Sequence, residues 1–314
     1  MNVIIRLATP TDYPAIVDVG WRATADYGLT VADLRFAEQQ RAADTVAGRF
    51  VAVTPDQQII GAASYGQSAP ADDPRRFNVW FHVLPQYQGQ DIGKRLYERV
   101  MAELTPHGPH CLETGVRTDL PRAVRFLADR GFTEVMRECE THLELATFEP
   151  DRFVADLQRM AVLGLELKML TELNADEERD AKLYQLHRHQ HETAKNTSAF
   201  ALFDEWRAQF WQLPHLHADA FCVAVAGDQY VGHSHALVTD SPELIYGYTG
   251  VLPAYRNQGI ARAMKIGVLQ WAKAQGYTRV RSWSDSHNKA MIRVNLHLGF
   301  RVQPSVLWVE KKES

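Results

Sequence analysis

The sequence predicts an α+β fold that occurs twice along the chain, each copy a twisted mixed central sheet flanked by helices. The pattern Val-Leu-Pro-x-Tyr appears twice, and its prolines, Pro85 and Pro253, lie 168 positions apart (253 − 85). A Gly-Phe pair follows each copy at the same distance, at Gly131 and at Gly299. Strand-like and helix-like apolar spacings also alternate in one order in both halves. Matched spacings of this kind indicate two homologous domains in tandem.

The first half opens with a strand at 3–7, followed by a helix that Thr11 or Asp12 caps. Two further strands, at 49–54 and 59–65, flank a Pro-Asp-Gln turn. The remaining elements expected in this half are a strand at 77–83, a helix at 91–104, a strand at 111–117, a helix at 121–130 and a strand at 133–145.

The second half repeats this order after a short amphipathic helix at 150–163. We expect a strand at 165–170, helices at 176–191 and 202–212, strands at 220–226, 229–238 and 243–251, a helix at 259–275, a strand at 278–284, a helix at 288–297 and a strand at 300–310. The expected division is an N-terminal domain at 1–147, a linker helix at 148–163 and a C-terminal domain at 164–314.

Composition excludes several classes of protein. A length of 314 residues suits two domains, and a net charge of −4 gives no sign of a nucleic-acid or membrane surface. Three cysteines without short spacing predict neither a disulfide framework nor a zinc site, and they favour a reducing cytoplasm. His187, His189 and His191 point in different directions on a helix, so no metal is expected. The oligomeric state stays open.

The segment Arg-x-x-Gly-x-Ala at 256–261 stands between an apolar strand and a helix. Unpaired N–H groups at a helix N-terminus can bind a phosphate. Gly259 has no Cβ, so the backbone can approach an anion closely, and Arg256 adds a cation. This turn resembles the pyrophosphate-binding motif of the GNAT superfamily of acetyl-CoA-dependent N-acetyltransferases.

The resemblance covers nearly the whole chain, once per half, and implies two tandem GNAT-like domains with acetyl-CoA as co-substrate. The layout is similar to the branch of the family that contains mycothiol synthase, and no substrate is carried over from it. The cofactor-binding residues that the resemblance implies are Thr249, Val251, Arg256, Asn257, Gln258, Gly259, Ile260, Ala261, Asn288 and Asn295.

The sequence departs from the family pattern in two places. Asn295 stands where many members carry a tyrosine that protonates the departing thiolate, and an amide cannot act as an acid at neutral pH. The corresponding turn of the first half has Gln88 in place of Arg256 and Asp91 in place of Gly259. Leu120 stands where the second half has Asn288. A carboxylate opposes a diphosphate, so we expect the N-terminal domain to be degenerate, with a structural or substrate-shaping role.

Glu243 and His235 are the candidate general bases. Glu243 shares strand parity with Thr249, which would turn it toward the cleft, while His233 and His235 share one face of the neighbouring strand. Alternatively, Glu243 lies in a solvated turn after Pro242, and one histidine is buried with its hydrogen bonds satisfied.

The function expected is transfer of acetyl from acetyl-CoA to a primary amine by direct attack on the thioester in the C-terminal domain. A small-molecule acceptor is expected, because no basic or acidic groove points to a macromolecule. The alternatives are transfer of a longer acyl group, transfer to a protein amine, and a non-catalytic acyl-CoA sensor.

Overall fold

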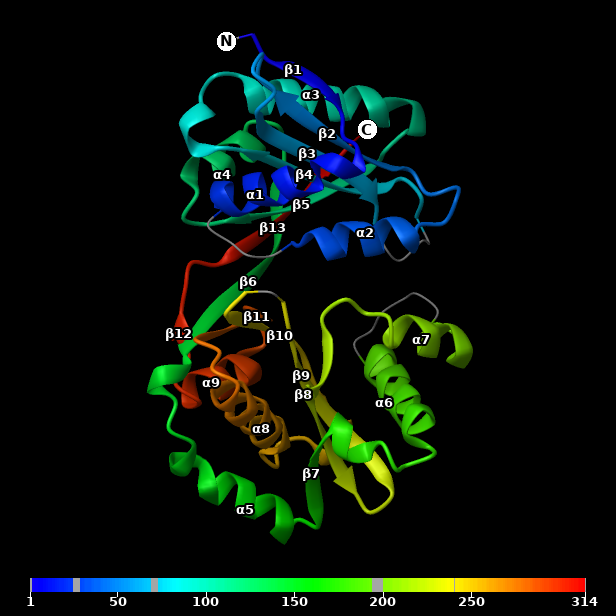
Figure 1. The fold of residues 1–314 in the computed structure, drawn as a ribbon, viewed down its shortest axis with the longest axis vertical. Helices are drawn as coiled ribbons and strands as arrows, with labels where there is room; N and C mark the ends of the chain where they lie inside the picture. The colour runs from blue at the N-terminus through cyan, green and yellow to red at the C-terminus, as the bar shows by residue number, and fades with distance from the viewer. Residues whose placement is uncertain (1, 25–28, 69–72, 194–199, 240, 314) are drawn as a thin grey trace. The chain divides into compact units, whose positions relative to one another are not determined.

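The computed structural model describes residues 2–24, 29–68, 73–193, 200–239 and 241–313, which form two compact units (Figure 1). Unit 1 consists of Met1–Glu138 and Pro304–Ser314, and unit 2 of Cys139–Gln303. Within the described ranges, no helix has both the length and the apolar character needed to cross a membrane.

Unit 1 is a mixed sheet with helices on both faces (Figure 1). Its strand order is β1 (Ile4–Leu7), β2 (Ala47–Val53), β3 (Ile59–Gln67), β4 (Arg76–Val83), β5 (Cys111–Arg117), β13 (Val306–Lys312) and the first half of β6 (Thr133–Glu144). Neighbours are antiparallel except β4 and β5, which are parallel. The helices are α1 (Tyr13–Thr24), α2 (Val31–Gln39), α3 (Ile92–Leu104) and α4 (Pro121–Ala128).

Unit 2 repeats this plan. Its strand order is the second half of β6, then β11 (Arg279–Asp285), β10 (Glu243–Val251), β9 (Gln229–Leu237), β8 (Leu216–Ala226) and β7 (Leu165–Met169), with β12 (Arg301–Val302) paired to β6. The helices are α5 (Val154–Val162), α6 (Arg179–Thr193), α7 (Phe203–Phe210), α8 (Ile260–Ala274) and α9 (Lys289–His297).

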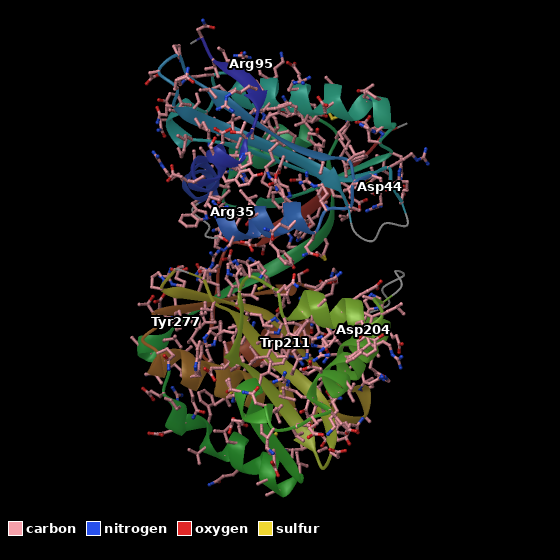
Figure 2. All side chains as sticks on the ribbon, turned by 45° about the vertical axis from the view of Figure 1, so that its right-hand side comes forward. Arg35, Asp44, Arg95, Asp204, Trp211 and Tyr277 are labelled. Atoms are coloured by element: carbon pink, nitrogen blue, oxygen red, sulfur yellow. The ribbon has the colours of Figure 1, made fainter. Side chains whose placement is uncertain are left out.

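The alternation of strand side chains places a separate apolar core on each face of the unit 2 sheet. On β8, Cys222 and Ala224 belong to the core that includes α8, while Phe221 and Val223 belong to the core that includes α6 and α7. Side chains fill the space between helices and sheet, and Trp211, labelled in Figure 2, lies directly after α7. The two faces of this sheet can therefore serve different ligands.

The structure confirms the fold class and nearly all of the expected elements. One difference is α2, a helix that the sequence analysis did not predict. Another is the final strand, which is broken between Val302 and Val306. The division also differs from the expected 164–314, because residues 304–314 belong to unit 1 and α5 belongs to unit 2.

The boundaries differ because the two units exchange strands. In unit 1, β13 lies between β5 and β6, and its register runs from Val306 opposite Arg117 to Lys312 opposite Cys111. Leu307 and Val309 are buried in the unit 1 core. In unit 2, the second half of β6 lies between β11 and β12. Each sheet thus contains a strand from the other half of the sequence.

Candidate active site

Strands β10 and β11 of unit 2 begin side by side and then separate. Their parallel pairing covers Glu243–Ile245 against Arg279–Arg281, although β10 continues to Val251 and β11 to Asp285. Beyond this point, β10 is paired with β9 on its other side. The described part of unit 2 therefore presents a strand edge whose backbone groups can pair with an extended ligand.

A tight turn connects this edge to α8. A short 3-10 helix at Pro253–Tyr255 follows the strand, and Asn257 and Gly259 take left-handed conformations with φ of 62° and 87°. Arg256 is held back against the strand, because its Nε donates a 3.1 Å hydrogen bond to the carbonyl of Val251. The turn directs the first N–H groups of α8 outward, where an anion can meet them.

A pocket of about 470 Å³ opens between this turn and α9. It is lined by Tyr248, Thr249, Gly250, Val251, Tyr255, Arg256, Asn257, Gly259, Ile260, Ala261, Arg262, Asn288, Ala290, Met291 and Val294. A Cβ at Gly259 would meet only Arg262 within 4 Å, so the turn leaves open space over its glycine. A cradle of N–H groups beside two arginines fits a diphosphate.

Two residues expected to bind the cofactor lie outside the lining of this pocket, Gln258 and Asn295. Asn295 is fully buried, and its Nδ2 is 3.2 Å from Thr141 Oγ1 and 3.2 Å from Ser282 Oγ. It therefore connects α9 to β6 and β11, a structural role that the sequence analysis missed. Asn288 lines the pocket, and its Oδ1 also accepts the N–H of Met291 and caps α9.

A bulge in β10 changes which side chains share a face. The register shifts between Tyr246 and Tyr248. Before it, Tyr246 faces α8, where its hydroxyl bonds the carbonyl of Lys265. After it, Thr249 bonds Ser234, while Tyr248 contacts the ring of His233 on the opposite face. The predicted shared parity of Glu243 and Thr249 is therefore wrong, because the bulge adds a residue between them.

Glu243 lies at the start of β10 and forms an ion pair with Arg279, at 2.8 Å. Arg279 also bonds Glu144, at 2.6 Å. The Glu243 side chain is 16% exposed, so it is not in a freely solvated turn. It lies on the face opposite Leu244, which belongs to the α8 core, and this face also carries His235.

Three imidazoles gather on the face that α6 and α7 cover. His187 and His233 have ring centroids 4.6 Å apart, and those of His233 and His235 are 5.5 Å apart. Phe221 stacks on both His233 and His235, at 4.9 and 5.1 Å. Burial lowers the pKa of His235 to about 4 and that of His187 to about 4, and it lowers the pKa of His233 well below its usual value.

These imidazoles are therefore neutral at pH 7, and several of their polar atoms lack partners within the described residues. Nδ1 of His233, Nδ1 of His235, Nε2 of His187 and Nε2 of Gln190 are buried without a hydrogen bond. His235 lies directly beside the bulge, since its Nε2 would be 2.3 Å from a Cβ at Gly247. Unpaired buried polar groups next to a binding pocket are typical of a functional site.

Tyr248 is one of several lining residues that the sequence analysis did not select as site residues. The residue is 44% exposed, and partial burial raises the pKa of its hydroxyl, an effect that Arg256 partly opposes. A Cβ at Gly250 would be 2.7 Å from the Tyr248 hydroxyl, so the glycine makes room for this ring. Gly250, two residues after Tyr248, was the feature of the sequence that could have indicated space for this ring.

The splayed strands, the left-handed turn and the helix N-terminus define a class of α+β proteins whose split sheet can hold an extended ligand with a diphosphate. The profile of the Acetyltransferase (GNAT) family matches residues 17–132 and 181–300. The chain therefore belongs to the GNAT family of acetyltransferases, with one family domain in each half.

Two curated relatives are similar to this chain. Mycothiol acetyltransferase of Thermobispora bispora is 24% identical over 302 residues, covering 93% of both chains. N-acetyltransferase 8B of Rattus norvegicus is 35% identical over 97 residues, which is 28% of this chain and 44% of the rat protein. The match thus spans less than half the length of the rat protein.

Two solved structures share the tandem architecture. A GCN5-related N-acetyltransferase from Sphaerobacter thermophilus has a TM-score of 0.71 at 16% identity, covering 99% of this chain and 95% of its own. A tandem GNAT protein from the clavulanic acid biosynthesis pathway has a TM-score of 0.73 at 15% identity, covering 99% and 98%. At these identities the likeness concerns the fold.

Proposed function

We propose that unit 2 transfers an acetyl group from acetyl-CoA to the primary amine of a small molecule. The observation that carries this proposal is the pocket of unit 2, in which a strand edge, a left-handed glycine turn and a helix N-terminus meet. The donor would place its diphosphate on the N–H groups of Gly259–Ala261, beside Arg256 and Arg262. Its arm would pair with β10.

The acceptor would approach from the face that α6 and α7 cover. The bulge at Gly247 turns the β10 backbone at the point where the two strands separate, and His235 lies against it. This face carries neutral imidazoles and aromatic rings around His233, and the Glu243–Arg279 ion pair at the start of β10. Such a surface suits a neutral amine, the form that can attack a carbonyl carbon.

The reaction would form a bond between the amine nitrogen and the acetyl carbon and break the bond between that carbon and sulfur. The amine proton would pass to Glu243 through a chain of waters. A rise of about 3.3 Å per residue separates the Cα atoms of Glu243 and Gly247 by roughly 13 Å, too far for direct contact. Arg279 holds the carboxylate in place. His235, closer to the bulge, is the alternative proton acceptor.

The thiolate would receive its proton from Tyr248, which lines the pocket and is protonated at neutral pH, because a tyrosine hydroxyl has an ordinary pKa of about 10 and burial raises the pKa of Tyr248. Tyr248 would act as the general acid, a role that the amide of Asn295 cannot fill. Tyr248→Phe should lower kcat roughly tenfold to a hundredfold and leave acetyl-CoA affinity nearly unchanged. A variant with unchanged kcat would exclude Tyr248 as the acid.

Steady-state release of CoA in the presence of a panel of primary amines tests the activity. The expected result is turnover with at least one small amine, and acetylated product detected by mass. A chain that binds acetyl-CoA but releases no CoA with any amine would instead be an acyl-CoA sensor. Comparing acetyl-CoA with longer acyl-CoA donors, and small amines with peptide amines, separates the remaining alternatives.

A further inference from the structure

Unit 1 contains an open cavity of about 390 Å³ between its sheet and α1 and α2. It is lined by Ile16, Val17, Gly20, Trp21, Thr24, Leu29, Leu34, Arg49, Ala62, Ala63, Ser64, Trp80 and His82. Its volume is that of a site for a small organic molecule, since such sites measure about 300–1,000 Å³. Every lining residue belongs to unit 1, so the cavity is independent of the site proposed for acetyl transfer.

The position of this cavity corresponds to the histidine cluster of unit 2. Trp80 precedes Tyr248 by the repeat offset of 168 positions (248 − 80). The strand pairings show which residues of the neighbouring strands correspond. Ser64 pairs with Trp80, and His235 pairs with Tyr248, so Ser64 of unit 1 corresponds to His235 of unit 2. In the same way, Ala62 pairs with His82.

His82 in turn precedes Gly250 by 168 positions (250 − 82), and Gly250 pairs with His233. Ala62 therefore corresponds to His233. One strand further, Arg49 pairs with Ser64 as Phe221 pairs with His235. The three stacked rings of unit 2 are thus replaced in unit 1 by Arg49, Ala62 and Ser64.

This replacement opens the cavity. A methyl group and a hydroxymethyl group stand where two imidazole rings fill the space in unit 2, and an arginine stands in place of a phenyl ring. Gly20 leaves further room, because a Cβ there would meet only Nδ1 of His82, at 3.9 Å.

The lining indicates the chemistry of the ligand. Two indole rings, Trp21 and Trp80, and several aliphatic side chains favour a flat, apolar molecule. The indole of Trp80 is fixed edge-on against Trp308, with centroids 5.9 Å apart and an interplanar angle of 84°. Trp21 is fixed by its Nε1, which donates to the carbonyl of Leu29 at 2.9 Å. The aromatic walls are therefore held in place before any ligand enters.

The positive charge of Arg49 favours a flat apolar ligand that carries a carboxylate. Among the described residues of the lining, Arg49 carries a positive charge and none is a carboxylate, and the Arg49 side chain is 13% exposed. Its Nη1 bonds Glu38, at 3.2 Å, and Glu38 also accepts the hydroxyl of Tyr13. A guanidinium has five N–H donors, so this contact leaves it able to bind a second carboxylate.

We propose that this cavity is a binding site for a small aromatic carboxylate, which unit 1 binds without acetylating it. The turn of unit 1 carries Asp91 in place of Gly259, so the site would act as a receptor pocket. Indole-3-acetate is the probe, with indole as the uncharged and tryptamine as the cationic comparison. Titration calorimetry on the full chain should show indole-3-acetate binding to one site with a Kd below about 1 mM.

Gly20→Leu is the principal variant, because it fills the cavity and replaces a helical glycine with a strong helix former. It should weaken binding of indole-3-acetate at least about tenfold. Asp18→Leu, at an exposed position of the same helix, is the matched control and should bind normally. Arg49→Met should weaken indole-3-acetate but not indole. Should Gly20→Leu fail to fold, Ala62→His, which restores the ring of unit 2, replaces it.

Three results would overturn the proposal. The first is no heat of binding for indole-3-acetate at several times about 1 mM. The second is binding that persists unchanged in a folded Gly20→Leu or Ala62→His variant. The third is that tryptamine binds more tightly than indole-3-acetate and that Gly20→Leu abolishes this tryptamine binding. The cavity would then be a site for a cationic ligand. Thermal unfolding of each variant shows whether it is folded.

Discussion

The turns of the two units have the same backbone but different chemistry. Each has two left-handed residues at matching places, with φ of 79° and 60° at Gly89 and Asp91, and of 62° and 87° at Asn257 and Gly259. The glycine therefore stands at the first of these places in unit 1 and at the second in unit 2. Both units have the left-handed turn, and its second position carries a carboxylate in unit 1 and a glycine in unit 2.

Gln88 and Arg256, the residues before the two turns, likewise make equivalent hydrogen bonds but differ in charge. Gln88 Nε2 donates to the carbonyl of Val83 at 3.0 Å, and Arg256 Nε donates to the carbonyl of Val251 at 3.1 Å. Glutamine reproduces the hydrogen bond that holds the turn to the strand but supplies no charge. Unit 1 thus keeps the architecture of a cofactor site, whereas unit 2 also keeps the cation and the open glycine.

The largest expected effect concerns the strand that unit 1 takes from the C-terminus. Deletion of residues 304–314 removes β13 from between β5 and β6. The loss of buried Leu307 and Val309 and of two strand pairings should destabilise unit 1 by more than about 5 kcal/mol, comparable to the stability of a whole domain. Peptide-resolved hydrogen exchange should show deprotection of β2–β4 and retained protection of β8–β10.

Deletion of Glu313 and Ser314 alone, which lie beyond β13, is the control and should leave both units protected. If the longer deletion instead exposed unit 2 and left unit 1 intact, the assignment of the C-terminal strand to unit 1 would be contradicted.

Acid should destabilise unit 2 before unit 1. His187, His233 and His235 have folded pKa values far below the ordinary 6.5, because they are buried. The unfolded chain binds protons that the folded unit excludes, so their contribution is complete above pH 6.5 and is lost as pH falls toward 4. At pH 5 the loss is about 2 kcal/mol per histidine. Unit 1 has Ala62 and Ser64 at two of these places.

Urea titrations followed by pulsed hydrogen exchange at one labelling pH would report each unit separately. Between pH 7.5 and 5, the midpoint of unit 2 should fall by more than that of unit 1. The double variant His233→Ala and His235→Ser, which carries the residues of unit 1, should show a smaller fall. Equal falls in both units would remove the histidine cluster as the cause.

The two units also differ at the start of the strand that carries the turn, where Arg75 of unit 1 stands 168 positions before Glu243 (243 − 75). Glu243→Gln should lower kcat about a hundredfold if the carboxylate takes the proton. It should mainly raise KM if it only attracts the amine. Glu144→Gln is the matched control, since it removes the other carboxylate bound to Arg279. Wild-type constants in Glu243→Gln would shift the assignment to His235.

Much of this architecture could be predicted from the sequence, because it depends on local signals. Apolar spacing, the paired turns and Gly259 located the sheets, the helices and the pocket. Even α2 had a local signal, since Thr30 and Asp33 form a reciprocal cap at its start. The proposed role of unit 2 follows from these features and from the family match.

Other features depend on contacts that no local pattern encodes. The apolar alternation of β13 is the same whichever sheet it enters, so the exchange of strands could not be predicted. The bulge near Gly247 reverses the faces of β10, and its only sign was a glycine within a strand. Asn295 has the position of a cofactor residue in the sequence, but the packing of α9 against Thr141 and Ser282 buries it.

The smallest expected effect is also the most direct test of the two turns. Acetyl-CoA should bind with a stoichiometry near one per chain, at unit 2. Gly259→Asp gives unit 2 the residue of unit 1 and should weaken binding about tenfold or more, which corresponds to about 1.4 kcal/mol. The reason is the carboxylate rather than backbone strain, since Asp91 adopts the left-handed conformation at φ 60° in unit 1.

The reciprocal variant Asp91→Gly should leave the stoichiometry near one, because unit 1 still lacks the cation and the asparagine of unit 2. Gln88 replaces Arg256, and Leu120 stands before α4 at the position where Asn288 caps α9. Calorimetry on both variants measures affinity and stoichiometry together. Unchanged affinity in Gly259→Asp would remove the diphosphate from the 256–261 turn. A second acetyl-CoA site in Asp91→Gly would show that the Asp91 carboxylate alone prevents unit 1 from binding acetyl-CoA. Two equal sites in the unmodified chain would show that this carboxylate does not prevent binding.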